Sequence, residues 1–360
     1  MTLDFTSALY LGLRHGHGEL SPWPALTTGR PAALGAPPLA EEMATLLATH
    51  MGCERALLAP STLHLFFDLF DALGREDIVI FAESGLYPIL RWGVERAAAK
   101  GAPVVSFPAG DADALARRIS AAPRKQPIVV CEGLRPPWGR LAPLADYVAL
   151  VRRRCGLVVL DDTQALGVLG ADPAPERPYG RGGGGTAAHL GVAAPELAIG
   201  ASLAKGYGAP LAVGGGSRKF IEFLERASPT RTHCSPPSIA EIAAAARALE
   251  IEGRCGDRLR RHLGARVAQF RTALGGLGLF PAGGLFPAQT LERLVDPVAF
   301  AAALARRGVA CVAHEGRGGV GAASFLVTAA HRPGDIAAAA AAIADALKLR
   351  HVRVFEEIDP

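Results

Sequence analysis

The amino-acid sequence predicts an α/β fold built around a mostly parallel sheet with helices on both faces. Five short runs are largely apolar, which is typical of parallel strands buried on both faces, at 77–81, 103–107, 128–131, 156–160 and 197–200. Helical stretches, such as 113–120 and 143–153, lie between them. This alternation indicates repeated βαβ units with right-handed crossovers.

The pattern changes after about residue 237. One long helical region is predicted over 238–274, with a break near Gly253 and Gly256. Shorter strand-like pieces and a closing helix follow, at 309–312, 324–328 and 335–349. We therefore expect an N-terminal segment that joins a small domain, then a large domain, then a small α+β domain, over 1–35, 36–237 and 238–360.

Composition narrows the function classes. Half of the 360 residues are apolar, and the net charge of +4 comes from scattered arginines, so no nucleic-acid surface is indicated. Six cysteines without a CxxC pair favour neither a zinc site nor a disulfide framework, and they suit a reducing cytoplasm. No signal peptide or membrane span is evident, so we expect a soluble, cytoplasmic protein. The glycine-rich stretch 181–185 is expected to be a flexible surface loop.

Two strand ends carry residues suited to one chemistry. The run 156–160 leads into Asp161 and Asp162, and the run 197–200 leads into Lys205 among glycines and alanines. Taken alone, a strand-end carboxylate is more commonly a cap and a lone lysine a surface residue. Together they fit an enzyme that uses pyridoxal 5'-phosphate (PLP). A buried lysine holds the aldehyde, and a carboxylate keeps the pyridine nitrogen protonated.

At these residues the sequence resembles the α-oxoamine synthases, within the fold type I (aspartate aminotransferase-like) PLP-dependent enzymes. The family pattern V-D-[DE]-A-H-x-x-G-V-x-G is similar to LDDTQALGVLG, and T-[LF]-S-K-[AS]-x-G is similar to SLAKGYG, at 160–170 and 202–208. Weaker matches occur in the same order along the chain, at 7–13, 132–144, 179–182 and 328–331. The resemblance implies that the large domain binds PLP.

The resemblance implies three catalytic roles. Lys205 would be the Schiff-base lysine, carrying the cofactor as an internal aldimine, and Asp161 the partner of the pyridine nitrogen. Gln164 stands where the family has a histidine that bonds the ring oxygen of the cofactor. A glutamine amide can donate that hydrogen bond but does not change charge with pH.

Further residues are implied to bind the cofactor. Ser61 and Thr62 open a helix after a strand, where backbone N–H groups and the helix dipole suit a phosphate. Ser202 would add a hydroxyl, and Thr232 would come from the second subunit of a homodimer whose active site lies at the interface. Tyr87 is apt to stack on the pyridine ring, although the alignment leaves its neighbour Leu86 as a competitor.

The sequence departs from the family where the substrate is bound. Ala8 replaces an Asn that touches the amino-acid carboxylate, and residues 322–324 replace a family R-L-R that clamps it. Alanine cannot replace a bidentate arginine contact. Another cation would have to bind the carboxylate, for which the candidates are Arg14, Arg135 and Arg317. Glu132, at another strand end, is a further candidate for a substrate-side role.

Three functions stay open from the sequence. The first is a PLP-dependent acyltransferase that condenses an amino acid or amine with an acyl thioester. The second is an aminotransferase, or another PLP enzyme of a specialised biosynthetic pathway. The third is a non-catalytic subunit, which retention of both Lys205 and Asp161 disfavours. In each enzyme reading the partners are small molecules.

Overall fold

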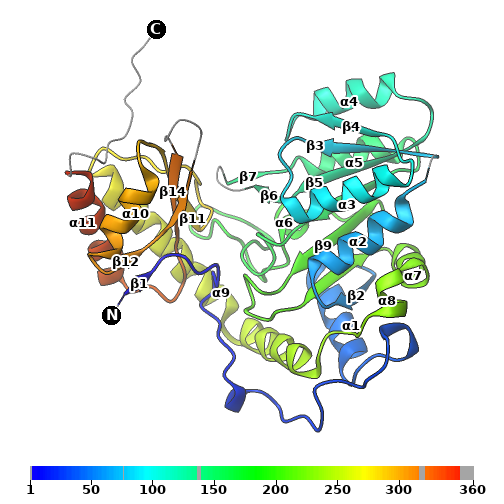
Figure 1. The fold of residues 1–360 in the computed structure, drawn as a ribbon, viewed down its shortest axis with the longest axis horizontal. Coiled ribbons are helices and arrows are strands. Elements are labelled where there is room, and N and C mark those ends of the chain that lie inside the picture. Colours follow the sequence, from blue (N-terminus) through cyan, green and yellow to red (C-terminus); the bar gives the residue numbers. More distant parts are fainter. Residues whose placement is uncertain (1, 76, 136–138, 316–320, 349–360) are drawn as a thin grey trace.

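The computed structural model describes residues 2–75, 77–135, 139–315 and 321–348 (Figure 1). Its centre is a seven-stranded sheet that contains all five predicted strands. The strand order is β2 (Arg55–Ala59), β10 (Ala212–Gly216), β9 (Leu197–Ser202), β8 (Leu157–Asp161), β5 (Gln126–Glu132), β3 (Ile78–Glu83) and β4 (Val104–Phe107). All neighbours are parallel except β10, which is antiparallel to both β2 and β9. The predicted fold class is confirmed.

Helices cover both faces of this sheet because its central strands, such as β3, β5 and β8, are apolar on both faces, whereas the edge strand β4 alternates exposed and more buried positions. The cluster on one face is built by α2 (Thr62–Leu73), α3 (Pro88–Ala99) and α7 (Arg218–Ala227). The cluster on the other face receives side chains from α1 (Ala40–Met51), α4 (Ala112–Ala121) and α5 (Leu144–Arg152). Burial on both faces removes the period-two alternation that marks a half-exposed strand.

The strand register brings several chain segments level at one edge of the sheet. Glu132 at the end of β5 pairs with Asp161 at the end of β8, and Asp161 pairs with Gly200 of β9. Ala212 of β10 pairs with both Ser202 and Ala59. The segments that follow β2, β5, β8 and β9 therefore all emerge at the carboxyl edge, where open α/β sheets bind their ligands.

A second, three-stranded antiparallel sheet lies at the left of Figure 1, in the order β11 (Ala288–Leu294), β14 (Gly321–Leu326) and β13 (Val312–His314). Helices α10 (Pro297–Ala305) and α11 (Pro333–Leu347) pack near it. The N-terminal strand β1 (Leu3–Asp4) pairs in parallel with β12 (Val309–Ala310), so the start of the chain joins this part. The exact domain boundaries at 36 and 238 stay a prediction.

The long helix α9 (Ile239–Gly275) is continuous over 37 residues, so the predicted break at Gly253 and Gly256 is wrong. A single glycine costs only about 1 kcal/mol inside a helix, which other contacts can offset. Here the buried Arg260 side chain forms ion pairs with Glu252 and Asp257, both at 2.5 Å, across the turns that contain Gly256. No helix in the described ranges is both long and apolar enough to cross a bilayer.

The glycine-rich stretch is only partly a surface loop, because Gly183, Gly184 and Gly185 are buried. The Gly183 carbonyl accepts a hydrogen bond from the Gly167 N–H at 2.7 Å, and Arg260 Nη1 donates to the Gly167 carbonyl at 3.0 Å. Gly183 has φ +66°, and a Cβ there would lie 2.5 Å from Arg260 Nη1. Gly183 is therefore needed for close packing against α9, and Gly184 and Gly185 pack against His50 and Asp162, so the prediction of a flexible loop over 183–185 is wrong.

The buried guanidinium of Arg260 gives the first test. Arg260→Leu should lower the free energy of unfolding by about 3–5 kcal/mol, because it leaves the Glu252 carboxylate buried without its cation. Urea denaturation followed by circular dichroism measures this. The matched control is Arg258→Leu, an exposed position on the same helix, which should change stability by less than about 0.5 kcal/mol. Equal stabilities of the two variants would contradict a structural role for Arg260.

Candidate active site

Lys205 lies three residues beyond β9, partly buried, at the carboxyl edge of the sheet. Burial lowers the pKa of Lys205 below its ordinary value, while the nearby charges of Asp161 and Glu132 oppose that shift. A lysine with a lowered pKa holds a larger share of neutral amine, which is the nucleophilic form. The structure thus brings Lys205, Asp161 and Glu132 together, as the sequence predicted for the first two.

Asp161 is almost fully buried at the end of β8. Burial raises the pKa of its carboxyl group, against hydrogen bonds from Thr163 and the positive charge of Lys205. The Thr163 N–H donates to Asp161 Oδ1 at 3.0 Å, and Thr163 Oγ1 accepts from the Ser202 N–H at 3.1 Å. Thr163 therefore joins the ends of β8 and β9. Sequence reasoning missed it, although its place beside Asp161 was a signal.

The neighbouring Asp162 has a different environment. Thr186, at the start of the short helix α6 (Thr186–His189), donates to its carboxylate from the backbone N–H at 2.9 Å and from the hydroxyl at 2.5 Å. Burial raises the pKa of Asp162 to about 6, aided by the charge of Asp161 and opposed by Thr186. Because the Asp162 carboxylate bonds Thr186, it fixes the start of α6 to the end of β8. Of the two carboxylates, Asp161 is the one whose charge acts on Lys205.

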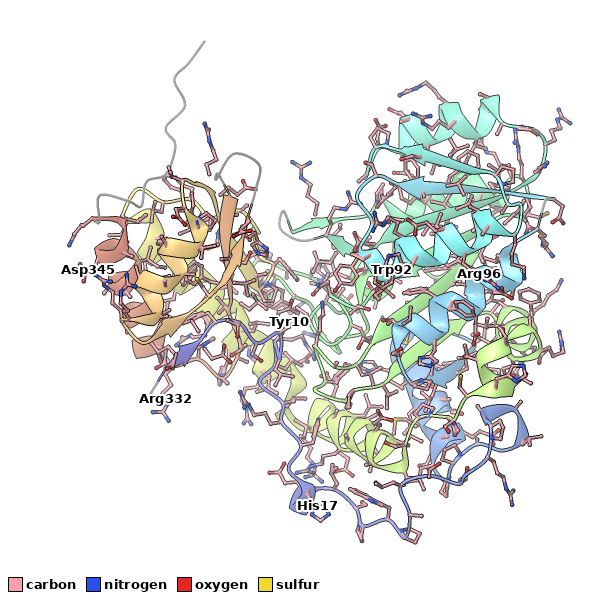
Figure 2. All side chains as sticks on the ribbon, viewed as in Figure 1. Tyr10, His17, Trp92, Arg96, Arg332 and Asp345 are labelled. Carbon is pink, nitrogen blue, oxygen red and sulfur yellow. The ribbon has the colours of Figure 1, made fainter. Side chains whose placement is uncertain are left out.

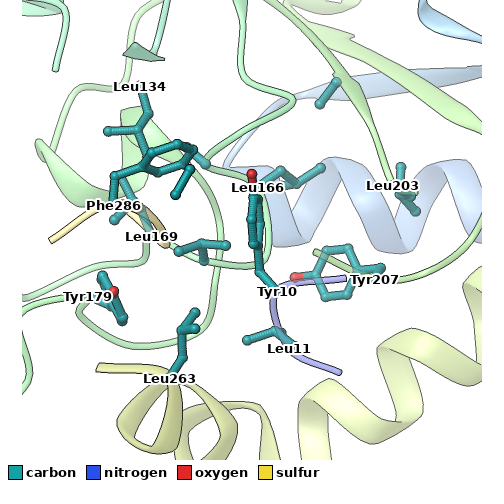
Figure 3. Packing of buried hydrophobic residues seen from close by; sticks show 14 of the residues in the cluster. Tyr10, Leu11, Leu134, Leu166, Leu169, Tyr179, Leu203, Tyr207, Leu263 and Phe286 are labelled. Atoms are coloured by element: carbon teal, nitrogen blue, oxygen red, sulfur yellow. The ribbon is translucent and has the colours of Figure 1, made fainter. Parts of the chain in front are cut away.

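Gln164 is held by a residue to which the sequence assigned no role. The buried Tyr10 donates from its hydroxyl to Gln164 Oε1 at 2.8 Å, and its backbone N–H donates to the Lys205 carbonyl at 3.2 Å. Figure 2 places Tyr10 between the two sheets, and Figure 3 shows its ring among buried residues that include Phe286. Because the Gln164 oxygen is occupied, its NH₂ group is the part left to bind a ligand.

Tyr87, rather than Leu86, faces the lysine. Lys205 Nζ lies 5.9 Å from the centroid of the Tyr87 ring, which is 54% exposed. Leu86 is buried in the apolar cluster beneath α3. Tyr87 begins that helix, since Pro88 occupies its first turn. Its ring is thus available for contact with a planar ligand beside Lys205.

The predicted phosphate turn also lies at the carboxyl edge. Ser61 caps α2, its hydroxyl accepting from the His64 N–H at 3.4 Å and bonding His64 Nδ1 at 2.9 Å, and Thr62 is the first helical residue. Ala59 at the end of β2 and Ser202 at the end of β9 both pair with Ala212 of β10, which lies between them. The ends of β2 and β9 are therefore about 10 Å apart, two strand spacings. Ser202 Oγ accepts from the Ala204 N–H at 3.2 Å.

Two predicted residues, Thr232 and Arg14, are not brought to this edge by the described contacts. Thr232 is exposed on the short helix α8 (Pro229–His233), and its hydroxyl approaches only the Ser228 carbonyl, at 3.5 Å. Arg14 is exposed and its charge acts on Asp4. Arg317 lies outside the described residues.

Glu132 belongs to a buried charge cluster beside Asp161. Arg135 Nη2 lies 3.2 Å from Glu83 Oε2, and its Nε lies 3.7 Å from Glu132 Oε2. Tyr147 donates to Glu83 Oε1 at 2.7 Å. Burial raises the pKa of Glu132 to about 7, with the charge of Asp161 adding to the shift and Arg135 opposing it.

The positions that replace the family's R-L-R clamp contain no cation. In β14, Ser324 is buried and its hydroxyl bonds Thr290 Oγ1 at 2.7 Å and His314 Nε2 at 2.8 Å. Ala322 pairs with His314 across the strands. The serine hydroxyl is thus used within the small sheet, and no guanidinium is supplied from residues 322–324.

Comparisons with solved structures define the class of fold. A variant of the enzyme SPT solved with PLP superimposes with a TM-score of 0.84 at 15% identity, covering 96% of this chain and 87% of that structure. The serine palmitoyltransferase of Sphingomonas wittichii gives 0.78 at 16% identity, covering 96% and 87%. The 8-amino-7-oxononanoate synthase of Francisella tularensis gives 0.74 at 16% identity, covering 96% and 98%. The chain has the fold of the fold type I PLP-dependent enzymes.

Relatives detected by sequence are named 8-amino-7-oxononanoate synthase. The chain is 34% identical over 207 residues to the 8-amino-7-oxononanoate synthase of Dechloromonas aromatica, and 32% identical over 238 residues to that of Burkholderia mallei. These matches cover 57% and 66% of this chain, and 50% and 57% of the two relatives, so this chain spans about half of the length of these relatives. No protein-family model matches the chain. The predicted resemblance to the α-oxoamine synthases is confirmed.

The raised pKa of Glu132 predicts how stability depends on pH. In the folded protein Glu132 keeps its proton up to about pH 7, whereas in the unfolded chain, where the ordinary pKa of 4.5 applies, it loses the proton near pH 4.5. Folding therefore takes up a proton on Glu132 between these two pH values. The free energy of unfolding of the cofactor-free protein should therefore fall between pH 5 and 7.5, by about 2–3 kcal/mol from this group. In Glu132→Gln that part of the fall should be absent.

Urea titrations of the two proteins at several pH values measure the difference. Asp161 and Asp162 titrate in both proteins, so the difference between the two curves reports Glu132 together with its charge coupling to Asp161. Glu95→Gln, which alters an exposed carboxylate of α3, is the control and should keep the pH dependence of the wild type. If the free energy of unfolding of wild type and of Glu132→Gln depended on pH in the same way, the raised pKa of Glu132 would be contradicted.

Proposed function

We propose that this chain is a PLP-dependent transferase that condenses an amino acid or amine with an acyl thioester, with Lys205 carrying the cofactor. The observation that supports this most is the facing pair of Lys205 and buried Asp161 at the carboxyl edge of a fold type I sheet. The relatives named 8-amino-7-oxononanoate synthase support the acyl-transfer chemistry.

The residues present fit this cofactor. Asp161 is a buried carboxylate that a cationic pyridine nitrogen would match, and Lys205 lies above an accessible aromatic ring. Among the described residues, the Gln164 amide nitrogen has no partner, which leaves a donor for the ring oxygen. When bound, PLP supplies an electron-accepting ring that stabilises negative charge on the carbon next to the substrate nitrogen.

Each residue has a separate task in this proposal. The negative charge of Asp161 would favour a protonated ring nitrogen, and the hydrogen bond from the Thr163 N–H keeps that carboxylate oriented. Lys205, with its lowered pKa, serves as nucleophile for the aldehyde and afterwards holds and returns a proton at its Nζ atom. Tyr87 would hold the ring by stacking, and Gln164, oriented by Tyr10, would offer its amide N–H to the ring oxygen.

The phosphate is assigned to the start of α2 and the end of β9. Ser61 and Thr62 offer backbone N–H groups at a helix N-terminus, and Ser202 offers a hydroxyl. Thr232 would reach this site from the other subunit of a homodimer, since it is exposed on α8. We place the enzyme in the cytoplasm, in keeping with the free cysteines of the described residues.

An aminotransferase is the second candidate, and one observation favours it. Neither Ala8 nor residues 322–324 supplies the polar contacts that an α-oxoamine synthase makes with the substrate carboxylate. The two reactions differ in their products. In acyl transfer the carbon–hydrogen bond next to the substrate nitrogen and the acyl carbon–sulfur bond break, a carbon–carbon bond forms, and the proton leaves with the sulfur as a free thiol. In transamination the donor would lose its amino group and be released as a carbonyl compound, and no thiol would be released.

Binding of the cofactor to Lys205 is tested by spectroscopy. The purified protein supplied with PLP should show a visible absorption band that survives dialysis, and Lys205→Ala should lose it. Lys219→Ala, at an exposed lysine on α7, is the control and should keep it. A band of wild-type intensity in Lys205→Ala would contradict the assignment of this lysine.

The reaction is tested by measuring thiol release from acyl-CoA in the presence of single amino acids or amines. We expect thiol release that depends on both substrates and falls by at least about 1000-fold in Lys205→Ala, because the nucleophile is lost. Loss of the visible band on adding an amino donor, with no thiol release from any acyl-CoA, would instead identify an aminotransferase.

A further inference from the structure

A short ribbon beside the candidate site brings two arginines face to face. Strand β6 (Leu134–Arg135) pairs with β7 (Arg140–Leu141) so that Arg135 and Arg140 are directly opposite. Residues opposed in this way lie on the same face, with Cβ atoms about 5 Å apart, and like charges there repel each other. The charge of Arg135 is already matched by the Glu83 and Glu132 carboxylates, so Arg140 is the cation of the pair that is left for a ligand.

Both arginines line one cleft of about 340 Å³. Its remaining lining consists of two carboxylates and small or apolar residues: Glu83, Ala109, Gly110, Glu132, Leu141 and Ala142. The cleft adjoins the candidate active site through Glu132, which pairs with Asp161 across the strands and whose charge acts on Lys205.

The two arginines are held differently. The Arg135 side chain is 12% exposed, is paired with Glu83 and Glu132, and has a buried Nε atom without a hydrogen bond. Glu83 is itself fixed by Tyr147 and by the Gly110 N–H at 3.0 Å. Arg140 is exposed and has no ion-pair partner within the described ranges. One cation is therefore fixed in the wall of the cleft, and the other is free beside it.

We propose that Arg140, with Arg135 behind it, binds a carboxylate of the substrate. The pair supplies the cationic contact that Ala8 and residues 322–324 do not provide, and the proposal rests on the proposed function because the bound group must reach Lys205. A planar, singly charged carboxylate matches the guanidinium fork. A phosphate dianion fits less well, because Glu83 and Glu132 line the same cleft and would repel the second charge.

The test uses the PLP-loaded protein and titration calorimetry with acetate, succinate and inorganic phosphate. Wild type should bind at least one of the two carboxylates saturably, and Arg140→Ala should bind it about tenfold more weakly, since one charge-assisted hydrogen-bond donor is removed. Arg140→Lys should recover part of the affinity, because it restores the charge without the fork. Arg118→Ala, which removes an exposed arginine of α4, should bind like wild type.

Three results would overturn the carboxylate subsite: equal affinities of wild type and Arg140→Ala, no saturable binding of either carboxylate to wild type, or tighter binding of phosphate than of both carboxylates. Visible absorption of the same samples reports cofactor binding separately. A protein that binds no PLP but still binds succinate through Arg140 would contradict the proposed function and leave the subsite standing.

Discussion

Two consecutive buried carboxylates at the end of β8 constrain the surrounding structure. Burial raises the pKa of both Asp161 and Asp162, so each needs hydrogen bonds or a cation to stay charged inside the protein. Asp162 obtains two hydrogen bonds from Thr186 on one side. On the other side, Asp161 obtains one from Thr163 and a favourable charge from Lys205. The strand end therefore fixes two separate segments of the chain.

The contacts on the Asp162 side of this strand end explain why the glycine-rich stretch 183–185 is buried and not a flexible surface loop. A Cβ at Gly185 would lie 2.0 Å from Asp162 Oδ2, and one at Gly183 would meet Arg260. Arg260, which lies on α9, donates to the carbonyl of Gly167, and Gly167 in turn donates to the Gly183 carbonyl; α9 packs against α11 of the small sheet region. The same strand end that presents Asp161 to Lys205 thus also connects the central sheet to the second part of the chain.

The sequence was sufficient for features that depend on local patterns. Apolar runs predicted the parallel strands, and the family resemblance selected Lys205, Asp161 and Gln164, which the structure places near one another. It could not show burial of 183–185, because these glycines pack against residues distant in sequence, which include Arg260, His50 and Asp162. Continuity of α9 through Gly256 was missed because the Arg260–Glu252 ion pair forms only once the helix is folded and its side chains are buried. Strand β10 (Ala212–Gly216) was also missed, since its three glycines weaken any β pattern. Tyr10 acts on Gln164, and Thr163 on Ser202, through tertiary hydrogen bonds that no spacing reveals, although the position of Thr163 near Asp161 was a signal.

The central claim is that Lys205 carries the cofactor, and chemical trapping tests it most directly. Reducing the PLP-loaded protein with borohydride fixes the cofactor to the amine that holds it, and peptide mass spectrometry then locates the modified residue. The modification is predicted on the peptide that contains Lys205 and not on those with Lys100, Lys125, Lys219 or Lys348. A stoichiometric modification at any of these other lysines, with Lys205 unmodified, would contradict the assignment.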